Sequence, residues 1–266
     1  ADTVLQRPKE LHPKYLIGKG KMEEVIIRCQ QLEADLIIFD EELTPGQIMN
    51  IAELTELKVI DRNQLILDIF SRRAKTKEAM IQVEVAQLRY ILPRLTGGNT
   101  ALSRLMGGIG GRGPGETKLE MDRRRIRDKI AALEKKLVDV RKVREKKRDR
   151  RNRSHIPVVS VVGYTNSGKS TLLNLLTKST VDVEDKPFST LNPTTRIIKY
   201  PERQNIIITD TVGFIDDLPQ VLLKAFAATL EELQDASLLL HLVDISAPDF
   251  EEQITSVEDI LKSIDL

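Results

Sequence analysis

The sequence has very little cysteine and few aromatic residues. Cys29 is the only cysteine among 266 residues, and tryptophan is absent. One thiol cannot form an internal disulfide, which excludes a small scaffold stapled by disulfide bonds, and we expect Cys29 to be a buried, reduced thiol. Aromatic residues make up 4% of the chain, and the basic stretch at residues 141–153 has none, so we do not expect that stretch to recognise single-stranded nucleic acid by base stacking.

Long apolar runs are also missing. No stretch approaches the ~20 residues that a helix needs to cross a bilayer, and residues 1–4 lack the basic and apolar pattern of a secretory signal. We therefore expect a cytoplasmic protein without a membrane span. The spacing of His12, His155 and His241 predicts no transition-metal site.

Positive and negative residues nearly balance over the whole chain, but they are unevenly distributed. The whole chain carries +1, whereas residues 116–155 contain 17 Lys and Arg against 8 Asp and Glu. Residues 141–153 are almost continuously basic. Such a run is either a solvated helix face or linker, or a surface that contacts the phosphates of folded RNA.

Residues 1–62 have the pattern of a small parallel α/β layer. Short β-prone runs at residues 35–39 and 58–61 flank a helical stretch at residues 45–54, an alternation typical of parallel strands joined by a helix. Residues 18–21 resemble a phosphate loop but lack its spacing, so we interpret them as a turn and a helix start.

Residues 63–155 have the pattern of an antiparallel helical hairpin. Two apolar stripes each advance in steps of 4, 3, 4 and 3, which predicts two long helices that bury their stripes against each other. The stripes are Ile81, Val85, Leu88, Leu92 and Leu95, and Ile126, Ile130, Leu133, Leu137 and Val140. Thr117 and Glu120 have the spacing of a capping box for the second helix.

A glycine- and proline-rich segment at residues 96–115 separates the two helices. It cannot continue either helix, so we expect a flexible tip loop. Arg94, Arg104, Arg112 and Lys118 lie in or beside it, and arginine pairs with phosphate in a forked geometry. The alternative is an ordinary mobile connector.

The most specific motif follows a β-branched run at residues 158–162, which predicts a buried strand. Residues 163–170 have the sequence G-Y-T-N-S-G-K-S and match the Walker A pattern G-x-x-x-x-G-K-S. In such a loop backbone N–H groups point at phosphates, Lys169 supplies a positive charge, and the Ser170 hydroxyl can ligate Mg²⁺. A helix starting at Lys169 directs the positive end of its dipole to the same place.

Two further motifs distinguish a GTPase from other P-loop proteins. A second buried strand is predicted at residues 206–209, and a D-x-x-G motif follows at residues 210–213. Asp210 would hold Mg²⁺ mostly through water, and the Gly213 N–H could contact the γ-phosphate. Thr190, in a polar connector, is the candidate for the second protein ligand of the metal.

These motifs define the predicted site. We predict catalytic roles for Lys169, Thr190 and Gly213, and metal binding by Ser170, Thr190 and Asp210. The predicted nucleotide contacts are Gly163, Tyr164, Thr165, Asn166, Ser167, Gly168, Lys169, Ser170, Thr171, Phe188, Ser189, Thr190, Leu191, Asn192, Asp210, Thr211, Val212 and Gly213.

The chain resembles the HflX family of ribosome-associated GTPases over almost its full length. The resemblance rests on residues 107–118, 122–125, 188–191 and 210–219, with further similarity at residues 15–21 and 92–97. It implies an α/β protein in which a P-loop NTPase G domain, residues 156–266, follows a small α/β subdomain, residues 1–62, and a helical hairpin, residues 63–155. It also implies a monomer that binds and hydrolyses GTP, associates with the large ribosomal subunit and its RNA, and splits or rescues stalled ribosomes.

Two residues shape the expected mechanism. Many GTPases have a water-orienting glutamine where this chain has Phe214, so we predict slow hydrolysis unless a partner or a monovalent ion supplies charge. Asn166 stands where potassium-using relatives carry an ion-binding asparagine, which makes K⁺ a hypothesis. The alternative is an asparagine that merely tolerates a tight loop.

An N-K-x-D motif is missing. The chain ends at Leu266, after a strand expected at residues 238–244 and a helix to Leu261. We therefore expect a G domain truncated at its C-terminus, with impaired base selectivity and an exposed apolar strand edge. Members of the family commonly have Asp where this chain has Asn192, and we assign no mechanism to this difference. The alternatives are an RNA- or ribosome-binding fragment with an inactive nucleotide site, and a P-loop ATPase.

Overall fold

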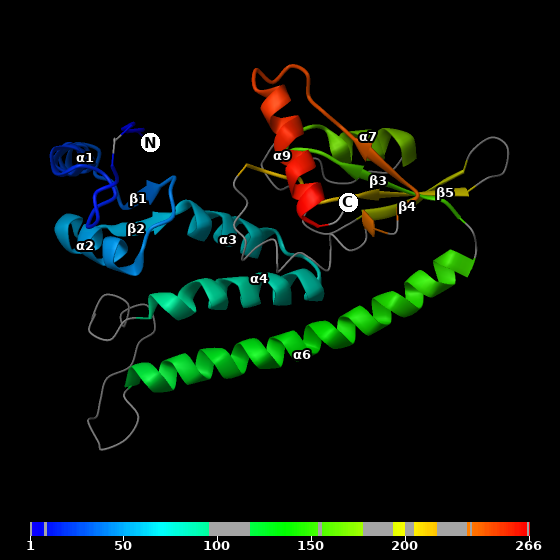
Figure 1. Ribbon diagram of the computed structural model, residues 1–266, viewed down its shortest axis with the longest axis horizontal. Helices are drawn as coiled ribbons and strands as arrows, with labels where there is room; N and C mark the ends of the chain where they lie inside the picture. The colour runs from blue at the N-terminus through cyan, green and yellow to red at the C-terminus, as the bar shows by residue number, and fades with distance from the viewer. Residues whose placement is uncertain are drawn as a thin grey trace. The chain divides into compact units, whose positions relative to one another are not determined.

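The computed structural model describes residues 2–7, 10–95, 118–153, 156–177, 194–199, 205–216, 233–234, 236–264 and 266. The chain divides into two compact units, which are described separately (Figure 1). One unit is Ala1–Asp68 with Leu88–Asp128, and the other is Ile69–Gln87 with Lys129–Leu266. Within the described ranges, no helix combines the length and the apolar character that a membrane crossing requires.

The first unit is built on a two-stranded parallel sheet. β1 (Leu36–Phe39) pairs with β2 (Lys58–Asp61), and α2 (Pro45–Thr55) connects them. α1 (Lys19–Gln31) begins directly after Gly18. The predicted parallel α/β layer is confirmed, as is the interpretation of residues 18–21 as a turn and a helix start.

The start of α2 illustrates why these residues fold as they do. The Thr44 hydroxyl accepts a hydrogen bond from the Gln47 N–H at 3.2 Å, and the Gln47 side chain accepts one from the Thr44 N–H at 2.9 Å. This reciprocal capping box satisfies two backbone donors that a helix start leaves unpaired. Pro45 at the first helical position has a backbone angle already suited to the helix.

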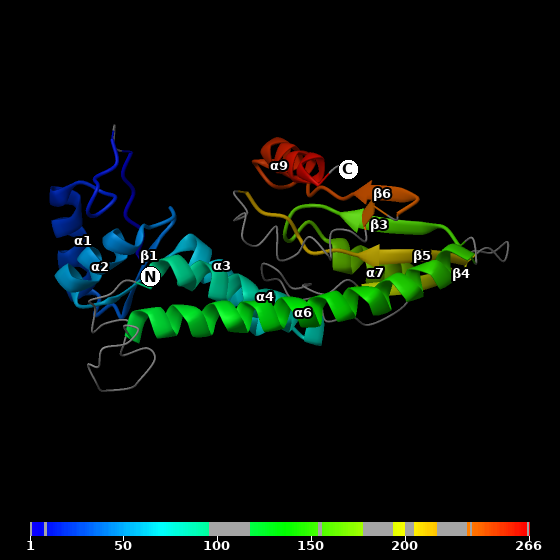
Figure 2. The ribbon, with the colours of Figure 1, turned by 60° about the horizontal axis from the view of Figure 1, so that its bottom comes forward.

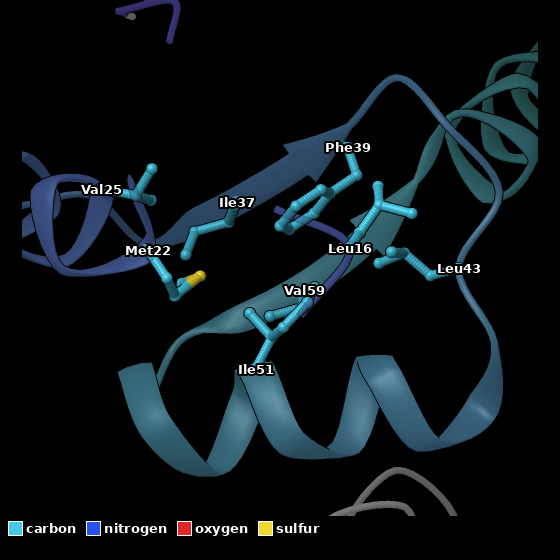
Figure 3. Close-up of a cluster of buried hydrophobic side chains, with 8 residues drawn as sticks. All are labelled: Leu16, Met22, Val25, Ile37, Phe39, Leu43, Ile51 and Val59. Carbon is cyan, nitrogen blue, oxygen red and sulfur yellow. The ribbon is translucent and has the colours of Figure 1, made fainter. Parts of the chain in front are cut away.

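Apolar side chains from both helices and both strands form the core of this layer (Figure 3). Each fully buried aliphatic side chain stabilises the fold by about 1.5–3 kcal/mol. The cluster consists of Leu16, Met22, Val25, Ile37, Phe39, Leu43, Ile51 and Val59. Cys29 packs at its edge and is only partly buried, less than predicted, and that burial raises the pKa of the thiol.

The prediction of one continuous helix over residues 63–95 is wrong. α3 (Arg62–Arg73) and α4 (Lys77–Ile91) are separate helices, and a short 3₁₀ turn, η1 (Leu92–Arg94), follows. The Thr76 hydroxyl accepts a hydrogen bond from the Ala79 N–H at 3.2 Å and thereby caps a new helix. Pro93 is compatible with the 3₁₀ turn but not with continuation of α4.

α6 (Lys118–Arg153) is the second helix of the hairpin and has 36 residues. Ile126, Ile130 and Leu133 of its predicted stripe are buried. Lys129 Nζ lies 2.6 Å from Glu84 Oε1 of α4, which ties the two helices together. Thr117, and with it the predicted capping box, lies outside the described residues.

Arg94, expected to be available for phosphate beside the tip loop, is instead part of the first unit's interior. Its guanidinium lies 2.9 Å from Glu42 Oε1 and 3.6 Å from Asp61 Oδ2, and it stacks on the Tyr90 ring at 3.6 Å from the centroid. It also donates a hydrogen bond to the Leu43 carbonyl at 3.2 Å. The residue anchors the end of the hairpin's first helix to the β1–β2 layer.

A four-stranded sheet organises the second unit (Figure 2). Its order is β4 (Thr194–Lys199), β5 (Asn205–Asp210), β3 (Val158–Val162) and β6 (Leu238–His241). β3 is parallel to both of its neighbours, and β4 is antiparallel to β5. The predicted strands at residues 158–162 and 206–209 are confirmed, and this α/β unit has the expected P-loop G-domain fold.

Helices cover both faces of this sheet. α7 (Lys169–Thr177) begins where predicted, and α9 (Phe250–Ser263) follows β6. Val161 packs in a cluster with α7, whereas Val162 packs in a cluster with α9. Because successive strand residues point to opposite faces, the two helices lie on opposite sides of β3.

β6 is shorter than predicted, since it ends at His241 rather than Asp244. Among the described strands it pairs only with β3, so its other side is an edge of the sheet. Leu238 is 58% exposed and Leu240 is 38% exposed. The predicted exposed apolar edge is present in the described part of the chain.

Candidate nucleotide site

The site is built on the loop that joins the end of β3 to the start of α7. Three of its residues have positive φ: Gly163 at 154°, Asn166 at 63° and Gly168 at 89°. A Cβ on Gly163 would lie 2.3 Å from the Leu242 carbonyl oxygen. The loop's tight course beside the strand end therefore requires glycine at this position, because any larger residue would clash with backbone.

Lys169 lies inside this loop with 6% of its surface exposed. Its ammonium donates to the carbonyl oxygens of Gly163 at 3.1 Å and Tyr164 at 2.5 Å, and lies 3.4 Å from Ser167 Oγ. Burial lowers the pKa of Lys169 from 10.5 to about 8, and the Asp210 carboxylate raises it in part. The side chain is therefore a buried cation at neutral pH, held by its own loop.

Ser170 and Asp210 meet directly beside Lys169. The Ser170 hydroxyl donates a hydrogen bond to Asp210 Oδ2 at 2.7 Å, and both residues are buried. The Thr211 hydroxyl donates to the Val161 carbonyl at 2.7 Å, which fixes the end of β5 against β3. A hydroxyl and a carboxylate are oxygen ligands of the kind that Mg²⁺ prefers, so this pair fits that ion.

The D-x-x-G segment lies against the phosphate loop. The Phe214 N–H donates to the Gly163 carbonyl at 3.1 Å, and the Thr165 N–H donates to the Phe214 carbonyl at 2.8 Å. A Cβ on Gly213 would lie 2.9 Å from Thr165 Cα and 3.2 Å from Lys169 Nζ. The short distance to the Thr165 backbone favours glycine at this position, which brings the Gly213 main chain close to the Lys169 ammonium.

Phe214 is turned away from this charge and into the core. The side chain is buried in an apolar cluster with Val162, Leu233 and Val257. A buried phenyl ring has no hydrogen-bonding group to offer a water molecule. The position occupied by glutamine in many GTPases therefore serves packing in this chain.

Sequence reasoning found most of the residues that meet here and missed two others. Tyr164 was predicted as a nucleotide contact, but its hydroxyl donates to Asp216 Oδ2 at 2.8 Å, and Ser256 of α9 binds the same carboxylate. No spacing in the sequence indicates that pairing. Thr171 is exposed on α7 and Val212 is buried. The remaining predicted contacts lie outside the described residues: Phe188, Ser189, Thr190, Leu191 and Asn192.

Comparison with family models matches three successive parts of the chain. Residues 1–71 match the model described as "GTP-binding GTPase N-terminal", and residues 73–151 match "GTP-binding GTPase Middle Region". Residues 158–265 match "50S ribosome-binding GTPase".

Proteins named "GTPase HflX" in several bacteria are similar to this chain. A "GTPase HflX" of Caldanaerobacter subterraneus subsp. tengcongensis is 52% identical over 98% of this chain and 61% of its own length. One of Escherichia coli K12 is 47% identical over 97% of this chain and 60% of its own length. The crystal structure titled "SsGBP and GDP complex" is 29% identical, has a TM-score of 0.52, and covers 97% of this chain and 69% of its own. The chain thus spans about three-fifths of the length of these bacterial relatives.

Proposed function

Because the chain belongs to the HflX family of GTPases, we propose that it binds GTP and hydrolyses it to GDP and phosphate between Gly163 and Gly213. The observation that carries this proposal is the buried convergence of Lys169, Ser170 and Asp210. A buried lysine whose pKa is lowered, close to a buried hydroxyl and a buried carboxylate, is the kind of cluster that marks a functional site.

Each residue of the site has a role in this proposal. The backbone N–H groups of residues 166–170 cradle the phosphates at the N-terminus of α7. The Lys169 ammonium exchanges its carbonyl partners for β- and γ-phosphate oxygens, which are stronger acceptors because they are charged. The Gly213 N–H donates to the γ-phosphate and stabilises charge that develops there during phosphoryl transfer.

Mg²⁺ is the metal that this donor set favours. Ser170 and Asp210 would hold it from the protein side, and Thr190 is the proposed further ligand. When bound, the ion supplies neutralisation of the phosphate oxygens. The base would be guanine, as in the GDP complex of the similar crystal structure.

Hydrolysis would be slow without help. The Phe214 ring is buried in the core, so a water molecule must be oriented by another group, either a partner or a bound monovalent ion. We propose K⁺ held by Asn166, and the alternative is that asparagine stands here because it tolerates the φ of 63° in a tight turn. Turnover in K⁺ should exceed turnover in Na⁺, and equal rates would remove this part of the proposal.

The proposed partner is the large ribosomal subunit, in the cytoplasm. Support comes from the family model "50S ribosome-binding GTPase" and from the excess of positive charge in residues 116–155. Such charge favours the phosphate backbone of folded RNA. We propose that the chain acts as a monomer on stalled ribosomes and splits or rescues them.

We further propose that the chain has three functional parts: residues 1–62, residues 63–155 and residues 156–266. The separate family models over residues 1–71, 73–151 and 158–265 support boundaries near these positions. In this division the hairpin contacts RNA and the last part binds nucleotide.

Calorimetric titration of GDP and a nonhydrolysable GTP analogue, with Mg²⁺ present, tests the proposal. Wild type should bind both, and Lys169→Ala should lose at least about tenfold in affinity because a phosphate-facing charge is removed. Competition of labelled GTP by ATP as effectively as by GDP would favour the ATPase. A folded wild type that binds no purine nucleotide, yet binds ribosomal RNA, would favour the RNA-binding fragment.

A further inference from the structure

The hydroxyl of Tyr164, in the phosphate loop, makes two hydrogen bonds with a single residue, Asp216. Tyr164 Oη donates a hydrogen bond to Asp216 Oδ2 at 2.8 Å and accepts one from the Asp216 backbone N–H at 3.3 Å. Asp216 lies three positions after Gly213. The hydroxyl therefore fixes both the side chain and the main chain of the segment that leaves the D-x-x-G motif.

A second hydroxyl, on another element, holds the same carboxylate. The Ser256 hydroxyl of α9 donates to Asp216 Oδ1 at 2.5 Å. α9 is itself anchored, because Val257 is fully buried and packs in the cluster that contains Phe214. Asp216 thus connects the phosphate loop on one side with a packed helix on the other.

The segment between Gly213 and Asp216 is consequently held at both ends. Two backbone hydrogen bonds join Phe214 to Gly163 and Thr165, and the tyrosine and serine hydroxyls hold Asp216. The Tyr164 ring packs beside the cluster around Phe214. Its hydroxyl points at Asp216, so it serves the segment beyond Gly213 rather than a phosphate.

We propose that Tyr164 is a positioning residue, and that its hydroxyl, with Asp216 and Ser256, holds Gly213 where its N–H meets the γ-phosphate of GTP. This set, the Tyr164–Asp216–Ser256 clip, favours the triphosphate over the diphosphate and speeds its hydrolysis. The inference rests on the proposed GTPase function, and it adds a group outside the phosphate-binding motifs.

Physical chemistry gives the clip its expected effect. An N–H that is already in place loses little conformational entropy when the γ-phosphate arrives, whereas a mobile one must be ordered first. GDP lacks the γ-phosphate and does not reach Gly213, so its affinity is insensitive to the clip. Burial raises the pKa of the Tyr164 hydroxyl, which keeps it a neutral donor at physiological pH.

The test compares Tyr164→Phe, which removes only the hydroxyl, with Ser256→Ala and Ser256→Thr. We expect Tyr164→Phe to lower kcat by about tenfold, the scale of one hydrogen bond to a charged group. Affinity for a nonhydrolysable GTP analogue should fall by a similar factor, while affinity for GDP stays within about twofold. Ser256→Ala should show a smaller loss in the same direction, and Ser256→Thr, which retains the hydroxyl, should restore wild-type behaviour.

Two matched controls separate the clip from general loss of a hydroxyl. Tyr15 stacks on His12 in the first unit, so Tyr15→Phe should leave all three constants unchanged. Thr255 adjoins Ser256 on α9 but bonds the Glu251 carbonyl on an exposed face, so Thr255→Ala should also be silent. Equal loss of GDP and GTP-analogue affinity in Tyr164→Phe would overturn the proposal, since it would show a role in phosphate-loop folding alone.

Hydrogen exchange of the nucleotide-free chain tests the clip without reference to GTP. Tyr164→Phe should accelerate exchange of the Phe214 and Asp216 amides and leave the amides of α7 unchanged. Unchanged exchange at both amides would overturn the clip even if GTP binds normally. Failure of wild type to bind nucleotide, with exchange accelerated as expected, would overturn the proposed function while the clip itself survived.

Discussion

At the scale of single residues, the charge of Lys169 should control how tightly the proposed site holds a triphosphate. Burial lowers its pKa to about 8 in the free protein, and phosphate oxygens would raise that value because they favour the charged form. Nucleotide binding is then accompanied by proton uptake above pH 8. Affinity should be level below pH 8 and fall with rising pH above it, by up to about tenfold per pH unit.

Titrating the GTP analogue at pH 7, 8 and 9 checks this dependence. Lys169→Arg is the control, because a guanidinium stays charged throughout this range and its profile should be flat even if its affinity is lower. In the absence of nucleotide the sign is opposite: the unfolded lysine, with its ordinary pKa of 10.5, binds more protons between pH 8 and 10.5. The contribution of Lys169 to the free energy of unfolding therefore becomes more favourable as pH rises through that window.

Gly163→Ala tests the close approach of the phosphate loop to the strand end. The added methyl would lie 2.3 Å from the Leu242 carbonyl oxygen, at a φ of 154°, so the backbone must shift. We expect a loss of about 2–4 kcal/mol in the free energy of unfolding, together with loss of nucleotide binding. Gly20→Ala is the matched control, since a Cβ there meets nothing within 4 Å and should stabilise α1 by about 0.5–1 kcal/mol. Urea unfolding of both variants measures the difference, and similar stabilities would contradict the argument.

Local motifs explain why some functional residues could be predicted and others could not. Lys169 and Ser170 are adjacent in a motif whose spacing already specifies the loop, and Asp210 follows a buried strand, so the sequence was sufficient for all three. Arg94 looked free for phosphate because its partner Glu42 lies 52 positions away. Ion pairs between distant residues have no periodic signature, and they are formed only when the chain folds.

At the scale of elements, Arg94 ties the turn after α4 to the β1–β2 layer. Its side chain is 12% exposed and the paired Asp61 is fully buried. Arg94→Met should lower the free energy of unfolding by about 2–4 kcal/mol, because it leaves the buried Asp61 carboxylate without the guanidinium beside it. Arg28→Met removes an exposed pair with Asp2 and should lower the free energy of unfolding much less, because solvent screens that pair. Calorimetric melting measures the melting temperature of both variants. Equal decreases from wild type would show that the burial of Arg94 is not stabilising.

The break between α3 and α4 shows where periodicity is insufficient for predicting elements. Apolar spacing predicted only part of the buried face of α4, since Ile81 and Val85 are buried but Leu88 is half-buried. It carries no information about the cap that Thr76 provides. Threonine is compatible with a helix interior as well as with a cap, so the choice is made by its hydroxyl finding the Ala79 N–H. The strands were easier to predict, because β-branched runs such as residues 158–162 are short and bounded by glycine or proline.

At the scale of the whole molecule, charge segregation predicts how the proposed binding to ribosomal RNA should respond to salt. Residues 116–155 contain 17 Lys and Arg, and each phosphate that they neutralise releases counterions. If about five phosphates are neutralised, affinity should fall roughly 10²- to 10³-fold between 50 and 200 mM salt. Filter binding of the large subunit across this range measures the slope of the logarithm of affinity against the logarithm of salt concentration. Replacing Lys135 and Lys136, which are exposed on α6, with glutamine should reduce the slope, whereas replacing the exposed Lys262 of α9 should not.

The general architecture could be predicted because alternating strands and helices, followed by a phosphate motif, admit few topologies. The strand order around β3 and the packing of α9 beside Phe214 depend on contacts between segments far apart in the chain. Those contacts are selected by burial and shape over the whole fold, so no local pattern encodes them.

The strand that bears the phosphate loop has a neighbour on each side, since β3 lies between β5 and β6. Fraying of a sheet starts at its margins, where fewer bonds hold each strand. Among the described strands, β4 and β6 stand at the two margins and should separate first, while β3, which bears the loop, keeps its pairing with β5. Separation of the marginal strands should therefore leave the proposed phosphate loop folded until the central strands unfold.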